Sequence, residues 1–222
     1  MYVGFIALII LASIHLFANK VKVLGWIWHG RFLSFASGIS FAYVFVDLLP
    51  QIEKGQNILK PVIPYLDRHA YVIALLGMLF FYGLHAQSQT ESKRNFWLLT
   101  SGYIFFNLLV GASLSDSTNP EIQPLYLFTI AMGMHYFIRD HNIREEKARW
   151  LLVAALFTGY FTGTIIHIPK TVIAIAVSFI AGGVLLNTLH YELPKNEKIG
   201  YLFFLIGAIL YTAIILNVGL LA

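Results

Sequence analysis

Five polar residues within long apolar stretches of the chain are the strongest candidates for chemistry. They are Asp47, Asn107, His135, His190 and Glu192. A charged side chain at the centre of a bilayer costs about 2.5–3.5 kcal/mol on insertion scales, so each residue needs a partner, a cavity or a function. Imidazole, carboxylate and amide groups can all ligate metals. We therefore treat each of these five residues as a candidate functional residue.

Asn107 and His135 lie deepest in their apolar stretches. A neutral imidazole at His135 can ligate a metal, shuttle a proton or bond to a neighbouring backbone. Asn107 is equally explained by an inter-helix hydrogen bond, which contributes about 0.6 kcal/mol in membranes. Arg139 follows His135 by one helical turn, and its charge repels a cation there unless Asp140 or lipid phosphate neutralises it.

Several other polar residues lie near the ends of apolar stretches. Asp47, His85, His167 and Glu192 can reach the headgroup layer from such positions, which is a second interpretation for each. His15, near the end of the first stretch, is expected to be an interfacial residue and not a ligand.

The composition indicates that these residues belong to a membrane protein. Of 222 residues, 58% are apolar and only 12% are charged, and the mean hydropathy is +0.73. One crossing needs about 20 residues, so the chain can cross a bilayer about eight times. We predict an all-α fold, one transmembrane domain over residues 1–222, with spans near 2–18, 32–49, 70–86, 96–114, 124–138, 150–168, 171–189 and 201–221.

The distribution of basic residues predicts the orientation, because cytoplasmic loops retain Lys and Arg. With the N-terminus outside, eleven basic residues fall on the inside: Lys20, Lys22, Arg31, Lys93, Arg94, Arg139, Arg144, Lys147, Arg149, Lys195 and Lys198. Four fall outside: Lys54, Lys60, Arg68 and Lys170. We therefore expect both termini outside, in a cell (inner) membrane. Because the basic residues lie in short loops, they do not indicate a nucleic-acid partner.

Residues 37–54 and 181–198 form a weak internal repeat. Aligning them pairs Gly38 with Gly182, Leu49 with Leu193, Pro50 with Pro194, Glu53 with Glu197 and Lys54 with Lys198. The two segments are the second and seventh predicted spans, and an odd number of crossings between them makes them antiparallel. This pattern predicts an inverted repeat, a common plan in transporters with a binding site near the midplane.

Several kinds of chemistry lack their usual sequence signals. The chain has no cysteine, which excludes disulfides and thiolate ligands. It has no Gly-rich phosphate loop, no nucleophile elbow and no His-Glu-x-x-His motif. We therefore expect that the protein is not an enzyme.

The two repeated segments resemble the ZIP (Zrt/Irt-like) family of divalent metal transporters. Residues 35–50 end in Asp47-Leu-Leu-Pro50, similar to the family's second helix. Residues 181–194 end in Glu192-Leu-Pro194, similar to its seventh helix. The resemblance implies eight helices with both termini outside, arranged as 3+2+3 with an inverted repeat, and zinc or a similar ion as transported substrate.

The family's transport site lies on the fourth and fifth helices, and here its motifs are altered. Its His-Asn-x-x-Glu/Asp-Gly motif corresponds to residues 106–111, where Asn107 and the glycine remain. Its His-Glu/Asp-x-Pro-Glu/His motif corresponds to residues 135–139, where only His135 remains and Arg139 replaces the last ligand. The resemblance implies Asp47 toward the outer mouth, Asn107 facing His135 at the centre, and His190 with Glu192 toward the cytoplasmic mouth.

Two hypotheses of function follow from the sequence. In the first, the protein moves a divalent metal cation or a small solute through a modified central site. In the second, it is a structural or regulatory membrane protein that retains the fold without the metal site. Zinc prefers about four N, O or S ligands, and Asn107 with His135 supplies two. Membrane lipid is an expected partner, and a homo-oligomer is compatible with either hypothesis.

Overall fold

The computed structural model describes residues 2–18, 20, 26–62, 67–87, 92–115, 125–140, 143, 145–166, 168–193 and 198–221, and these ranges hold helices and no strand. The α-helices are α1 (Tyr2–Phe17), α2 (Trp26–Tyr43), α3 (Leu49–Leu59), α4 (His69–Gln87), α5 (Lys93–Ser115), α6 (Leu125–Asp140), α7 (Glu146–Ile166), α8 (Lys170–Asn187) and α9 (Lys198–Leu221). Two π-helical turns accompany them, η2 (Val44–Leu48) and η3 (Thr188–Glu192). The predicted all-α class is confirmed for the described residues.

Six helical segments in the described part of the chain are long and apolar enough to cross a bilayer. They are Gly30–Leu59, His69–Gln87, Lys93–Ser115, Glu146–Ile166, Lys170–His190 and Gly200–Asn217. Helix α1 is apolar but shorter, and α6 has 16 residues. These lengths and compositions are compatible with an integral membrane protein.

The second predicted span, 32–49, lies within a longer helical segment. Helix α2 passes through η2 directly into α3, which ends at Leu59. Pro50 stands in the first turn of α3, where a missing backbone N–H is tolerated in an α-helix. The wider π-helical turn before it absorbs the irregularity, so the helix does not end at the proline.

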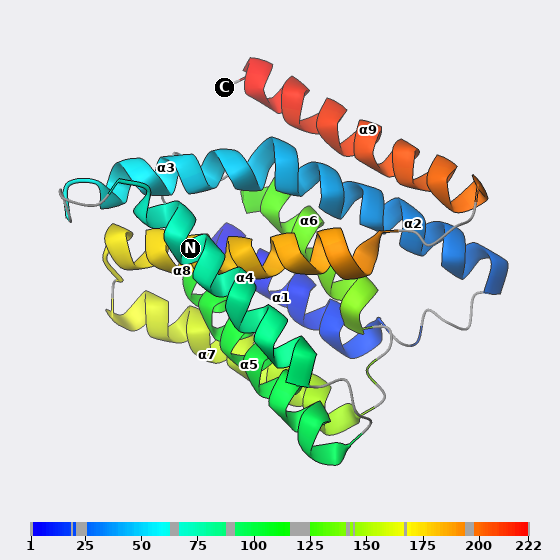
Figure 1. Cartoon of the computed structure of the whole chain (residues 1–222), viewed down its shortest axis with the longest axis horizontal. Coiled ribbons are helices and arrows are strands. Elements are labelled where there is room, and N and C mark those ends of the chain that lie inside the picture. The colour runs from blue at the N-terminus through cyan, green and yellow to red at the C-terminus, as the bar shows by residue number, and fades with distance from the viewer. Residues whose placement is uncertain are drawn as a thin grey trace.

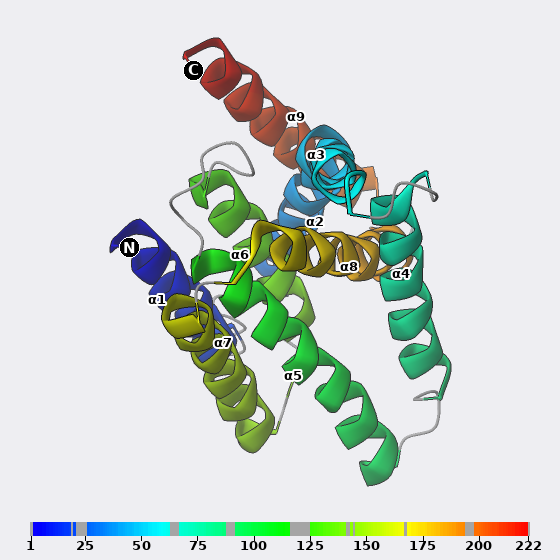
Figure 2. The same ribbon diagram turned by 90° about the vertical axis from the view of Figure 1, so that its left-hand side faces the viewer.

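The helices pack as two groups. One group contains α1, α5, α6 and α7, and the other contains α2, α3, α4, α8 and α9 (Figures 1 and 2). Helices α5 and α7, α2 and α9, and α4 and α8 form the most extensive pairs. Contacts of α2 with α6 and of α5 with α8 join the two groups. Helix α9 lies along α2 at the edge of the molecule (Figure 1).

Glycines bring the helix backbones of two of these pairs into direct contact. A Cβ atom at any of these glycines would overlap a carbonyl of the facing helix: Gly38 and Phe204, Gly207 and Phe35, Gly182 and Ala74, and Gly77 and Phe179. Such close approach of small residues is how helices associate where lipid removes the hydrophobic driving force.

The two crossings are related by the sequence repeat. The offset in residue number that pairs Gly38 with Gly182 also pairs Phe35 with Phe179 and η2 with η3. Helices α2 and α8, which carry these features, run in opposite directions (Figure 1). Equivalent crossings and equivalent π-helical turns on antiparallel helices are the features that an inverted repeat produces.

Substitution of the paired glycines should destabilise the protein by similar amounts. Gly38→Ala and Gly182→Ala each place a methyl group against a facing backbone, so we expect each to lower the free energy of unfolding by about 1–3 kcal/mol. Gly83→Ala is the control, because a Cβ there has open space and alanine favours the helix by up to about 1 kcal/mol. Thermal unfolding in detergent measures all three. Equal stability of Gly182→Ala and Gly83→Ala would contradict the close crossing.

Candidate functional site

A histidine and a carboxylate meet in the interior between the two helix groups. His135, on α6, is 1% exposed, and Glu192, the last residue of η3, is 7% exposed. Nδ1 of His135 lies in ion-pair contact with Oε1 of Glu192. Neither ring nitrogen of His135 has a partner in hydrogen-bond geometry among the described residues, so the contact is electrostatic. Nε2 is buried as well, so a water molecule or a cation reaches it only if the surrounding helices move apart.

Glu192 has a second contact within its own turn. The hydroxyl of the buried Thr188 donates to Oε2 of Glu192 over 3.4 Å. Thr188 and Glu192 begin and end η3, so the π-helical turn brings the hydroxyl to the carboxylate. Single π-helical turns are frequent at functional sites. The turn thus orients the Glu192 carboxylate, which contacts His135.

A second polar network lies wholly within the group of α1, α5, α6 and α7. Its centre is His15, which has no exposed surface. Nδ1 of His15 contacts Oδ2 of Asp140, and Nε2 lies 2.8 Å from Oδ1 of Asn107. The Asn107 amide nitrogen donates to the Tyr103 carbonyl over 2.8 Å, which fixes its oxygen toward His15. Both ring nitrogens of His15 therefore face oxygen acceptors, and the imidazole can donate to both only when each nitrogen carries a proton.

Arg139 belongs to the same network. Its Nε donates to Oδ1 of Asp140 over 2.8 Å, so one carboxylate contacts both Arg139 and His15. The guanidinium carbon lies 4.3 Å from the ring centre of Tyr103 and 4.9 Å from that of Tyr136, which is cation–π geometry. Asp140 thus neutralises the Arg139 charge, which was the condition for a cation to bind near His135.

Of the five predicted ligands, the structure brings His135 and Glu192 into contact with each other. Asn107 is bonded to His15 and to the Tyr103 carbonyl, and no contact with His135 is found for it. Asp47, in η2, is partly exposed, although its Oδ2 is buried without a hydrogen-bond partner among the described residues. His190 is exposed and lies near His85.

The described residues include no group of three or more His, Asp or Glu side chains that could hold a metal ion. A complete zinc site would need further donors beside His135 and Glu192. His167, which the sequence also identified, lies outside the described residues.

Sequence reasoning missed the role of His15. It was expected at the interface, whereas the structure buries it completely between Asp140 and Asn107. A signal was present, because His15 and Asp140 lie at the same predicted side of the membrane and an imidazole and a carboxylate can pair there. Their 125-residue separation hid the pairing. His85 is partly buried, with Nε2 lying 3.0 Å from the Tyr103 hydroxyl.

The sequence matches no known protein-family model, and no match was found among curated proteins. The resemblance to ZIP transporters therefore depends only on the motifs in the second, fourth, fifth and seventh predicted spans.

Removal of the Asp140 carboxylate should strongly destabilise the protein. Asp140→Ala leaves Arg139 and His15 without their shared anion in a dry interior, and breaking such a pair costs about 3–5 kcal/mol. Glu145→Ala is the matched control, because its side chain is exposed and surface substitutions stay within about 0.5 kcal/mol. Chemical unfolding in detergent compares the two. If Asp140→Ala were as stable as Glu145→Ala, the network would have no structural role.

Proposed function

We propose that the protein is a membrane transporter with a ZIP-like arrangement, in which a divalent cation such as zinc passes between the two helix groups at His135 and Glu192. The observation that carries the proposal is their buried contact, which joins α6 of one group to η3 of the other. Ionisable residues within membrane-spanning helices are rare and commonly mark ion pathways. An imidazole and a carboxylate are ligands that such a cation accepts.

The matched helix crossings and π-helical turns support a transport architecture. In transporters built from inverted repeats, the binding site lies near the midplane between the repeats, and one unit rocks against the other. Counting α1 and α6 with the six longer segments gives the proposed eight spans. With the basic loops on the cytoplasmic side, both termini would lie outside a cell membrane.

The proposed site differs from the one that the ZIP motifs imply. Asn107 contacts His15 instead of His135. The partner of His135 in the proposed site is therefore Glu192 and not Asn107. Two protein ligands leave the other coordination positions of a zinc ion to water. We therefore expect weak binding of divalent metal, which suits a transported ion better than a structural one.

The alternative is a structural or regulatory membrane protein. It is favoured by the network of His15, Asn107, Arg139 and Asp140, whose hydrogen bonds and ion pairs link α1, α5 and α6. In this case the contact between His135 and Glu192 would be a second stabilising interaction between helices. A homo-oligomer is compatible with both functions.

Flux through liposomes tests the proposal. We expect the wild-type protein to carry zinc, manganese or cobalt, and His135→Ala or Glu192→Gln to lower the rate at least tenfold. Glu145→Gln is the control, because Glu145 is exposed and lies outside the proposed pair. Thermal unfolding verifies that each variant folds. No flux from the folded wild-type protein, or equal flux from His135→Ala and wild type, would favour the structural role.

A further inference from the structure

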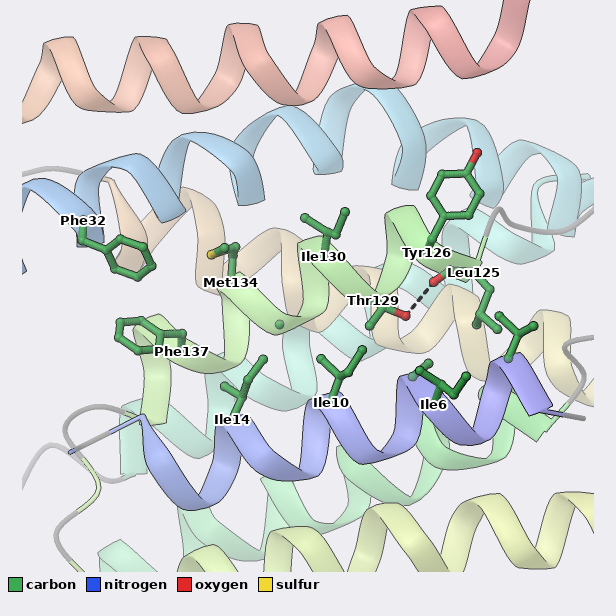
Figure 3. A pocket seen from close by; sticks show the side chains of 13 residues that line it. Ile6, Ile10, Ile14, Phe32, Leu125, Tyr126, Thr129, Ile130, Met134 and Phe137 are labelled. Carbon is green, nitrogen blue, oxygen red and sulfur yellow. Dashed lines mark hydrogen bonds between the residues drawn. The ribbon is translucent and has the colours of Figure 1, made fainter. Parts of the chain in front are cut away.

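A polar pocket of about 580 Å³ opens where α3 ends and α4 begins. Exposed side chains of both signs line it, Glu53 and Asp67 with Lys60 and Arg68. A second hollow, of about 480 Å³ between α1, α2 and α6, has an almost entirely apolar lining (Figure 3). Polar groups that water or an ion could contact are therefore concentrated at the first pocket.

The wall of the polar pocket continues into the interior through Gln56 and His69. Gln56 lines the pocket, and its Oε1 accepts from the Ala70 N–H over 3.0 Å. This bond turns the Gln56 amide nitrogen toward His69, where it lies 3.4 Å from Nδ1. His69 is buried, and its Nε2 has no hydrogen-bond partner among the described residues.

Ser178 and Gln51 extend these polar groups along α3. A Cβ at Gly55 would lie 3.3 Å from Oγ of Ser178, so the missing side chain lets this hydroxyl of α8 lie against α3. Gln51 precedes Gly55 by one turn on the same helix face. Ser178 is 1% exposed and Gln51 is 4% exposed. Within the described part of the chain, neither the hydroxyl nor either amide atom has a hydrogen-bond partner.

Asp47 and Ser40 follow Gln51 toward α2. The Asp47 carboxylate, one turn before Gln51, interacts with the Gln51 amide, although the amide lies outside hydrogen-bond geometry. Its Oδ2 is buried without a hydrogen-bond partner, while the exposed Lys54 interacts with the carboxylate electrostatically. Ser40, about two turns earlier, is a further buried hydroxyl without a partner in the ranges that the structure describes.

These side chains form a polar row that we define as His69, Ser178, Gln51, Asp47 and Ser40. Buried polar groups in native proteins nearly always have a partner in the protein or in ordered water. Along this row six polar atoms have none in the described structure. Because the row begins beside an open pocket, water can supply the missing partners. Polar residues inside membrane helices commonly face water-filled cavities or ion pathways.

We propose that the polar row lines a hydrated passage, which admits small cations from the pocket past Asp47 to Ser40. The Asp47 carboxylate gives the passage its preference for cations, because an ion that leaves bulk water needs an opposite charge. The pocket lies on the side that the basic loops predict to be outside.

The role of the passage as an ion entrance rests on the proposed transport function. Helix α2 contacts both η3 and α6, the elements that carry Glu192 and His135. A cation that has reached Ser40 on α2 is therefore beside the elements of the proposed site. The presence of water in the row can be tested without transport.

Single cysteines test for water in the row, because the chain contains none of its own. A thiol reacts as the thiolate, which forms poorly in an apolar interior. We expect Ser178→Cys to react with the cationic reagent 2-aminoethyl methanethiosulfonate at least tenfold faster than Ala176→Cys. Ala176 is the matched control, because it is buried on the same helix but lies outside the row. Mass spectrometry of the intact protein measures both rates.

Thermal unfolding verifies that these variants fold. If Ser178→Cys does not fold, Gln51→Cys is compared with Ile52→Cys, since Ile52 is the next residue and is also buried. Equal rates at the row and control positions of folded variants would overturn the passage.

A comparison with the anionic reagent 2-sulfonatoethyl methanethiosulfonate tests the charge preference. Each rate is divided by that of free cysteine with the same reagent. At Ser40→Cys we expect the cationic reagent to be favoured at least fivefold, and Asp47→Asn in the same background to remove this preference. Glu145→Gln, exposed and outside the row, should keep it. No preference, or one that Asp47→Asn leaves unchanged, overturns the passage of cations at Asp47.

The labelling and flux results separate this proposal from the proposed function. Fast, cation-selective labelling of a protein that carries no zinc would support the passage and overturn transport. Zinc flux through a protein whose polar row does not react would overturn the passage and leave transport in place.

Discussion

The interior of this protein depends on a few buried ionisable side chains that contact one another across helices. Asp140 provides the anion for both His15 and Arg139, and Glu192 provides it for His135. Removing one partner from a buried pair costs about 3–5 kcal/mol, which is a large part of the usual stability of a protein. The packing of α1, α5 and α6, and the meeting of α6 with η3, therefore depend on a few side chains at fixed positions.

The two polar clusters occupy different places in the architecture. His15, Asn107 and Asp140 lie inside one helix group, so they stiffen that group whatever the other group does. His135 and Glu192 join the two groups, so a relative movement of the groups would separate them. Both partners would then gain free coordination positions, which a cation or water could take. In the proposed transporter, the same contact would hold the two groups together and would supply ligands to an ion when the groups separate.

The sequence predicted the helices well because hydropathy is a local property. It also paired Gly38 with Gly182, and the structure places both glycines at equivalent helix crossings. The site was harder to predict, because partners depend on which helix faces which. His15 and Asp140 are separated by 125 positions, and no local pattern connects them. Pro50 suggested a helix end, whereas the π-helical turn before it lets the helix continue to Leu59. The motif likeness placed Asn107 opposite His135, but packing directs it to His15.

A double-mutant cycle on His135 and Glu192 most directly tests whether this pair joins the helix groups. The free energies of unfolding of His135→Ala, Glu192→Gln and the double variant would be compared with that of wild type in the same detergent. The account predicts a coupling energy of at least about 1 kcal/mol, because either single substitution already breaks the contact. Effects that add to within about 0.3–0.5 kcal/mol would contradict it, since independent sites behave in that way.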